Sequence, residues 1–173
     1  GFSRSDAAFA VSLILLGWGL LAPVVGWLSD RWHRRKPALI VAAAGNLMTM
    51  LVLFYRPDLW KVAIYWVLAV NGIFSAGIVV SFPVGREHND LRNAGAAMAI
   101  VNVGVIGSGA ISQPLVGWLL DRHWSGGMAD WIRVYDQAAY SGAFWVFPAS
   151  CVVATTLSLL IRETGVKAQV SAS

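Results

Sequence analysis

The sequence predicts an all-α, polytopic membrane protein with five transmembrane helices. Apolar residues make up 57% of the 173 residues and charged residues only 13%, against roughly 45–50% and about 25% in ordinary globular chains. The charged residues also gather in short clusters and leave five long uncharged stretches, which are 7–28, 37–55, 62–85, 93–120 and 137–161. About 20 helical residues cross a hydrocarbon core of about 30 Å, so each stretch is long enough to span a bilayer.

The first stretch, 7–28, does not have the features of a secretory signal, because neither Met nor a basic segment precedes it. We therefore expect the chain to come from the interior of a larger protein. The second and third stretches, 37–55 and 62–85, are bounded by the charged loops 29–36 and 86–92. The last stretch, 137–161, holds the single Cys151, so the sequence predicts no disulfide framework.

Basic residues are distributed unevenly between the two sets of loops. The loops 29–36 and 86–92 and the tail after Ile161 carry eight Lys and Arg residues against four acids, whereas the other segments have no net charge. The positive-inside rule therefore predicts that these loops and the C-terminus are cytoplasmic and that residue 1 lies outside. Several Trp residues fall near the expected boundaries, as in an aromatic belt. We expect a bacterial inner membrane, with the lipid bilayer as a partner.

One nine-residue segment occurs twice. Residues 23–31 (PVVGWLSDR) and 114–122 (PLVGWLLDR) are identical at seven of nine positions, at an offset of 91. Both copies close a span, yet the charge distribution places their ends on opposite sides of the membrane. Related helices three spans apart with opposite orientation indicate an inverted-topology repeat, which is typical of secondary transporters. If the repeat unit has three helices, the first unit lacks its first helix, which we expect upstream of residue 1.

The loop that follows the first span carries a family resemblance. The segment 26–36 (GWLSDRWHRRK) closely resembles the signature loop of the major facilitator superfamily, G-x-x-x-D-R/K-x-G-R-R/K. The resemblance covers essentially the whole chain and implies helices eight to twelve of a 12-helix fold built from 3+3 inverted repeats. It also implies that an N-terminal half of the same protein completes the transporter. His33 departs from the signature, because it occupies the position of a glycine, so we expect the loop to turn differently there.

The resemblance implies that the signature loop acts as a conformational latch. The residues assigned to this latch are Gly26, Asp30, Arg31, Arg34, Arg35 and Arg86. We expect Asp30 and Arg86 to approach each other when the cytoplasmic side is closed and to separate as it opens. An exposed ion pair contributes only about 0–1 kcal/mol, which suits a gate with two accessible states. The alternative is that Asp30 is a solvated acid and that Arg34–Lys36 only anchor the topology.

Candidate cavity residues are sparse, because no ionisable residue lies deep in any span. The polar and aromatic residues that recur on helical faces, and that we expect to line a substrate cavity, are Asn71, Ser75, Asn102, Gln113 and Trp18. The alternative for each polar residue is hydrogen bonding between helices, worth about 0.6 kcal/mol on average. The resemblance implies that the spans 37–55 and 137–161 face lipid.

The expected function is secondary active transport of a small solute by alternating access, as a permease of the symporter or antiporter type, with a proton or ion as a coupling partner. The alternative is a non-transporting receptor or accessory protein on the same scaffold. The sequence contains no paired acids at membrane depth and no nucleophile motif, so we do not expect an enzyme. Its three His residues lack the spacing of a metal site. We therefore expect no metal and no cofactor, and we interpret the basic cluster as a membrane anchor and not as a nucleic-acid site.

Overall fold

The computed structural model describes residues 3–56, 58–129 and 131–163 and contains five helical spans that are long and apolar enough to cross a membrane. The spans are Arg4–Arg31, Lys36–Tyr55, Lys61–Glu87, Leu91–Arg122 and Gln137–Leu160. Their bounds differ from the stretches expected from the sequence by three residues at most. The chain is therefore an all-α integral membrane protein with several spans.

Three of the spans are built from more than one segment. The first two are the single helices α1 (Arg4–Arg31) and α2 (Lys36–Tyr55). The third consists of α3 (Lys61–Ser75), the 3-10 helix η1 (Ala76–Val80) and α4 (Ser81–Glu87). The 3-10 turn η2 (Leu91–Asn93) precedes α5 (Ala94–Arg122), and the fifth span is α6 (Gln137–Phe144) followed by α7 (Val146–Leu160).

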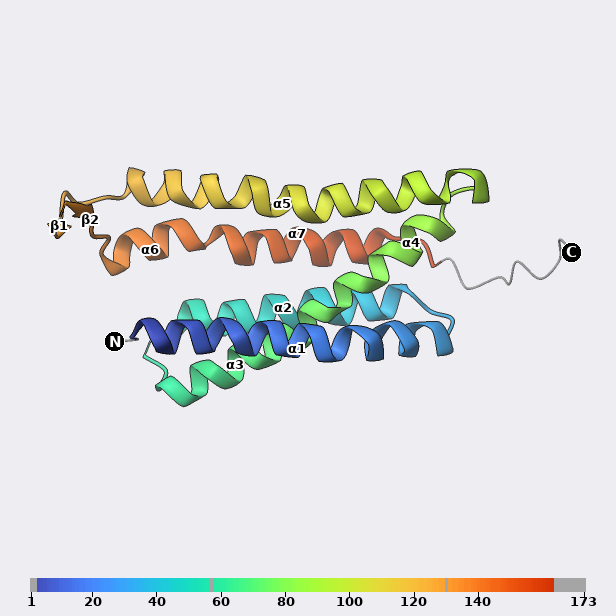
Figure 1. Cartoon of the computed structure of the whole chain (residues 1–173), viewed down its shortest axis with the longest axis horizontal. Coiled ribbons are helices and arrows are strands. Elements are labelled where there is room, and N and C mark those ends of the chain that lie inside the picture. The colour runs from blue at the N-terminus through green and yellow to red at the C-terminus, as the bar shows by residue number, and fades with distance from the viewer. Residues whose placement is uncertain (1–2, 57, 130, 164–173) are drawn as a thin grey trace, which may run out of the picture.

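A proline lies close to the break in each of the third and fifth spans. A proline inside a helix lacks an N–H group and its ring clashes with the carbonyl four residues earlier, which bends the helix. Pro83 is four residues after position 79 in η1, and Pro148 is four residues after Phe144, where α6 ends. The third span crosses the bundle obliquely, from the side of α1 and α2 to the side of α5 (Figure 1).

The helices pack in two groups, which are joined by the third span and by the packing of α7 against α2 (Figure 1). In the first group, α3 packs against α1 and α2. In the second group, α5 packs against α6, and α7 also packs against α2. The backbones of α1 and α3 touch, because a Cβ atom at Gly17 would lie 2.8 Å from the carbonyl oxygen of Ala69. Glycine is required at this crossing, since any side chain would separate the two helices.

The two ends of the bundle differ in character. One end, which we name the basic end, holds the turns 31–36 and 87–91 and the end of α7 (Figure 1). The other end, the hairpin end, carries the start of α1 and a small antiparallel hairpin of β1 (Met128–Ala129) and β2 (Ile132–Arg133). The signature loop thus lies at the basic end, beside the end of the third span.

Candidate functional site

Arg35 is the centre of an ionic cluster at the basic end. Its side chain is buried, with 7% exposed, although it lies in a loop between two spans. One guanidinium nitrogen donates to Asp30 Oδ1 at 2.5 Å and to Ser29 Oγ at 3.1 Å, and two others donate to Glu87 Oε1 at 2.8 and 3.1 Å. Arg35 therefore joins the signature loop to the end of α4.

The segment after α7 joins the same cluster through the backbone. The carboxylate of Glu163 accepts a hydrogen bond from the backbone N–H of Arg35 at 2.7 Å and a longer one from that of Lys36 at 3.4 Å. No neighbouring side chain caps the start of α2. Glu163 therefore supplies, from 128 residues away, the negative charge that a helix N-terminus favours.

The surroundings of Arg35 keep it charged. Burial by itself lowers the pKa of the Arg35 guanidinium, but the hydrogen bonds that it donates to the carboxylates of Glu87 and Asp30 raise the pKa by more, so that it lies above its usual value. The two carboxylates contribute unequally, because the side chain of Glu87 is 21% exposed and that of Asp30 is 67% exposed. The Arg35–Glu87 bridge is therefore the better sheltered contact, and the Asp30 bridge is the one that water weakens.

The predicted latch residues occupy different surroundings. Asp30 pairs with Arg35 of its own loop and not with Arg86, because Arg35 folds back over the end of α1. The guanidinium of Arg31 lies 5.7 Å from the centre of the Trp27 ring, and Gly26 faces Val79 of the third span. The side chains of Arg34 and Arg86 are exposed. The expectation that Arg86 approaches Asp30 when the cytoplasmic side is closed stays a prediction.

His33, the residue that departs from the signature, has an unusual backbone conformation. Its φ angle is 54°, in the left-handed region that glycine adopts without strain. A residue with a side chain holds this conformation at a cost in backbone strain, and the expectation that the loop turns differently from the signature stays a prediction.

Among the predicted cavity residues, Asn71 and Ser75 take part in a hydrogen-bonded contact between α2 and α3. The amide nitrogen of Asn71 donates to Asn46 Oδ1 at 2.9 Å and to Thr49 Oγ1 at 2.8 Å, and Ser75 Oγ donates to Asn46 Oδ1 at 3.0 Å. Asn71 is buried, with 5% exposed. Ser75 and Asn46 also border a cavity of about 410 Å³ between α2, the third span and α7. Asn46 therefore points toward the third span and not toward lipid.

The other predicted cavity residues lie on open faces. Trp18 of α1 and Asn102 and Gln113 of α5 are exposed. At three glycines of α5, which are Gly104, Gly107 and Gly109, an added Cβ would have no atom of the described chain within 4 Å. Asn102 and Gln113, which are eleven residues apart, lie on one face of α5, and this face is uncovered within the described part of the chain.

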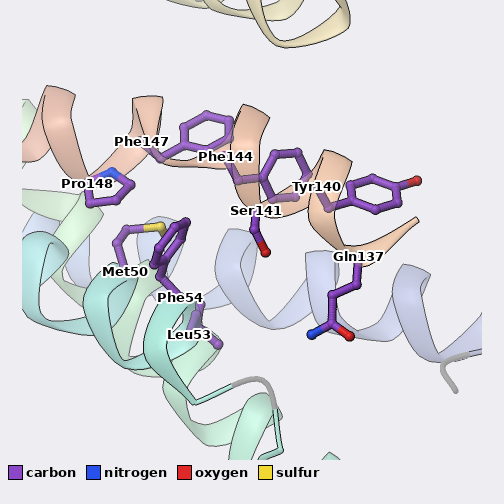
Figure 2. A pocket seen from close by; sticks show the side chains of 9 residues that line it. All are labelled: Met50, Leu53, Phe54, Gln137, Tyr140, Ser141, Phe144, Phe147 and Pro148. Atoms are coloured by element: carbon purple, nitrogen blue, oxygen red, sulfur yellow. The ribbon is translucent and has the colours of Figure 1, made fainter. Parts of the chain in front are cut away.

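A separate apolar hollow of about 460 Å³ lies between α2 and the fifth span. Figure 2 shows Met50 and Phe54 of α2 on one side and Phe144 and Phe147 on the other. The lining also includes Gln137, Tyr140 and Ser141, but no charged residue. The lining of this hollow is therefore mostly apolar, with polar groups only at Gln137, Tyr140 and Ser141.

Glu87 and Glu163 were missed as members of the site. Both are acidic residues in segments that the charge distribution assigns to the cytoplasmic side, together with the basic signature loop. This shared side was the only feature of the sequence that could have indicated an ionic contact with that loop. Their convergence on Arg35 depends on the packing of three segments that are distant in sequence.

Comparisons with known proteins agree with the architecture. The family model described as Major Facilitator Superfamily matches residues 1–173. The chain is 27% identical to the glycerol-3-phosphate transporter of Bacillus subtilis over 180 residues, which cover 98% of this chain and 36% of that protein. It is 26% identical to the multi-drug resistance efflux pump PmrA of Streptococcus pneumoniae over 114 residues, covering 64% of this chain and 27% of the pump.

A third relative is the peptide transporter YePEPT of Yersinia enterocolitica, 27% identical over 127 residues that cover 71% of this chain and 25% of the transporter. The chain thus spans about a third or less of the length of these relatives. No solved structure matches it.

Proposed function

The chain belongs to the major facilitator superfamily, and from this premise we propose that it forms the C-terminal helices of a secondary transporter that moves a small solute by alternating access. The whole protein sits in a bacterial inner membrane in this proposal, with the basic end in the cytoplasm. The relatives are transporters named for glycerol 3-phosphate, drugs and peptides, which supports a small-molecule substrate without selecting one.

The observation that carries the proposal is the Arg35 cluster. It joins the loop after α1, the end of α4 and the segment after α7 at one end of the bundle. Alternating access requires contacts that hold one end closed and that can be released. The exposed Asp30 bridge is weak enough for release, whereas the sheltered Arg35–Glu87 bridge fixes the loop in place.

The uncovered face of α5 is the wall of the solute path in this proposal. Asn102 and Gln113 present neutral amide groups there, and Trp18 on α1 offers an aromatic surface. An N-terminal half of the same protein covers this face and supplies any charged group that binds the solute or a coupling ion. Asn71 and Ser75 contribute to the position of the third span more than to the solute path, because they bond to α2.

The test is uptake by the whole protein in lipid vesicles, with labelled glycerol 3-phosphate, a dipeptide and a cationic dye as solutes. We expect uptake of one solute class, and we expect Asp30→Asn to change the initial rate by up to about fivefold, the value of an exposed ion pair. Asp58→Asn is the matched control, because Asp58 pairs with Arg56 at 3.2 Å and both side chains are exposed.

The latch and the transport function are tested by different results. An unchanged rate in the Asp30→Asn variant, with uptake intact, would refute the latch. Absence of both uptake and exchange for all solute classes would contradict transport and favour a receptor on the same scaffold.

A further inference from the structure

The two copies of the repeated segment end at opposite ends of the bundle and make the same local contact there. The first copy ends α1 at the basic end, and the second ends α5 at the hairpin end (Figure 1). In the first, the guanidinium of Arg31 lies 5.7 Å from the ring centre of Trp27; in the second, that of Arg122 lies 5.3 Å from the ring centre of Trp118. The sequence repeat is therefore also a structural repeat.

The aspartates of the two copies are also engaged in the same way. Asp30 Oδ1 is bound by Arg35, which comes from the loop that follows α1. Asp121 Oδ1 is bound by Arg133 at 2.7 Å and accepts a hydrogen bond from the Tyr135 hydroxyl, and both partners come from the loop that follows α5. In each copy the last acidic residue of the helix holds the cation of the following loop.

The loop after α5 is built so that Arg133 reaches Asp121. Arg133 pairs with Met128 in the hairpin, and the backbone N–H of Val134 donates to the carbonyl of Gly127 at 3.0 Å. The guanidinium of Arg133 also lies 4.7 Å from the ring centre of Trp124, a cation–π contact that holds the arginine over the end of α5.

We propose that Asp121, with Arg133 and Tyr135, is the hairpin-end counterpart of the Asp30 cluster and biases the hairpin end toward its closed state. The inference rests on the proposed alternating-access function. An inverted repeat makes the two ends structurally equivalent, so a contact that restrains one end has its equivalent at the other. Asp121 and Arg133 are each about half exposed, so their ion pair shifts a two-state equilibrium without locking it.

The two clusters differ in the number of segments that they join. Arg35 also binds Glu87 and its backbone binds Glu163, so the basic-end cluster joins three segments. The bonds described for Asp121 join only α5 to the loop before α6. Loss of Asp30 leaves those bonds of Arg35 in place, so Asp30 and Asp121 are each expected to shift the equilibrium by the value of one exposed ion pair, in opposite directions.

The experiment measures which end is open, in the whole protein reconstituted in vesicles. Single cysteines replace Asn102, nearer the basic end of α5, or Gln113, nearer the hairpin end, in a protein whose other cysteines, Cys151 included, are replaced. Their labelling rates with a water-soluble maleimide are measured with Asp30→Asn, Asp121→Asn, both changes together, and Asp58→Asn as control.

We expect Asp121→Asn to raise the labelling rate at position 113 by up to about fivefold and to lower it at 102. Asp30→Asn has the reverse effect, the double variant returns toward the parent, and Asp58→Asn changes neither rate. Arg133→Gln acts in the same direction as Asp121→Asn. The exchanged pair, Asp121→Arg with Arg133→Asp, restores the parent rates, which separates loss of the ion pair from damage to the fold.

Two results would overturn the inference: a shift in the same direction for Asp30→Asn and Asp121→Asn, or unchanged rates at both positions for Asp121→Asn and Arg133→Gln. If either result is found while the protein without these substitutions still takes up solute, only the inference fails. If the parent neither takes up nor exchanges any solute, the proposed function fails as well.

Discussion

At the scale of single residues, Arg35 shows how a membrane protein keeps a buried charge at its boundary. A buried cation costs free energy unless it is paired and hydrogen-bonded. Arg35 meets this requirement through Ser29, Asp30 and Glu87, and its planar guanidinium serves all three acceptors at once. A lysine at this position has a single point of charge and cannot make the same set of bonds. This set of hydrogen bonds explains why the loop contains an arginine at position 35.

His33 leads to the first prediction. Its left-handed backbone costs about 1–2 kcal/mol in a residue with a side chain. His33→Gly removes this cost, although the greater flexibility of glycine in the unfolded state offsets part of the gain. We expect a net stabilisation of about 0.5–1 kcal/mol, measured as a higher unfolding temperature of the whole protein in detergent.

The matched control for His33 is His88→Gly. His88 ends α4 with a φ angle of −86°, a conformation that any residue adopts. Glycine there brings flexibility without relief of strain, so the unfolding temperature is expected to stay the same or fall. Equal stabilisation by both variants would show that strain at His33 is not the cause.

At the scale of elements, the close packing of α3 against α1 depends on glycine residues in both helices. Gly17 of α1 lies against the backbone of α3, and Gly72 of α3 lies against the backbone of Ile14 in α1. The η1 segment and Pro83 then turn the span toward α5. Close packing on one side and a bend on the other place the end of α4, with Glu87, beside Arg35.

The α1–α3 crossing gives a second prediction. Gly17→Ala places a methyl group 2.8 Å from a backbone oxygen of α3, which must move. We expect a loss of about 1–3 kcal/mol of stability, the cost of overpacking, and a lower unfolding temperature. Gly19→Ala, two residues along the same helix, meets no described atom within 4 Å. It is expected to leave stability unchanged or to raise it by up to about 1 kcal/mol through helix propensity.

The hydrogen-bonded contact between α2 and α3 gives a third prediction. If Asn71 and Asn46 hold the two helices together, a double-mutant cycle of Asn71→Ala and Asn46→Ala yields a coupling free energy of about 0.6 kcal/mol in stability. Each single variant lowers the unfolding temperature and leaves the apparent affinity for the solute unchanged. A tenfold loss of affinity with unchanged stability would instead return Asn71 to the solute path.

At the scale of the whole molecule, Glu163 connects the last span to the first loop. Glu163→Ala removes the carboxylate that accepts from the N–H groups of Arg35 and Lys36. A lost helix cap costs about 1 kcal/mol, so hydrogen exchange of the amides in the first turn of α2 should accelerate about fivefold. Mass spectrometry of the whole protein in detergent measures this rate.

Asp136→Ala is the local control for this exchange experiment. Asp136 caps the start of α6 by accepting from the Ala139 N–H at 2.8 Å. Its loss is expected to accelerate exchange at the start of α6 and to leave α2 unchanged. Faster exchange at α2 in both variants would indicate a general loosening of the bundle and not the loss of the Glu163 cap.

Much of the architecture is predictable from the chain, because length without charge is a local property. The five uncharged stretches and the charged loops between them correspond to the helices and turns of the structure, and the repeat at an offset of 91 predicts that the ends of α1 and α5 are alike. Partners across the bundle are less predictable. The periodicity of Asn71 and Ser75 predicts a shared face but not that this face meets α2.

The sequence by itself therefore determined the number of spans, their approximate limits and the loop that carries the signature, because hydrophobic length, charge and motif spacing are set along the chain. Only the tertiary structure decided which charges meet. Asp30 binds Arg35, Glu87 and Glu163 converge on the same arginine, and Asp121 binds Arg133. The physical reason is that an ion pair depends on distances of a few ångströms between side chains, and those distances are set by how the helices cross, bend and end relative to one another.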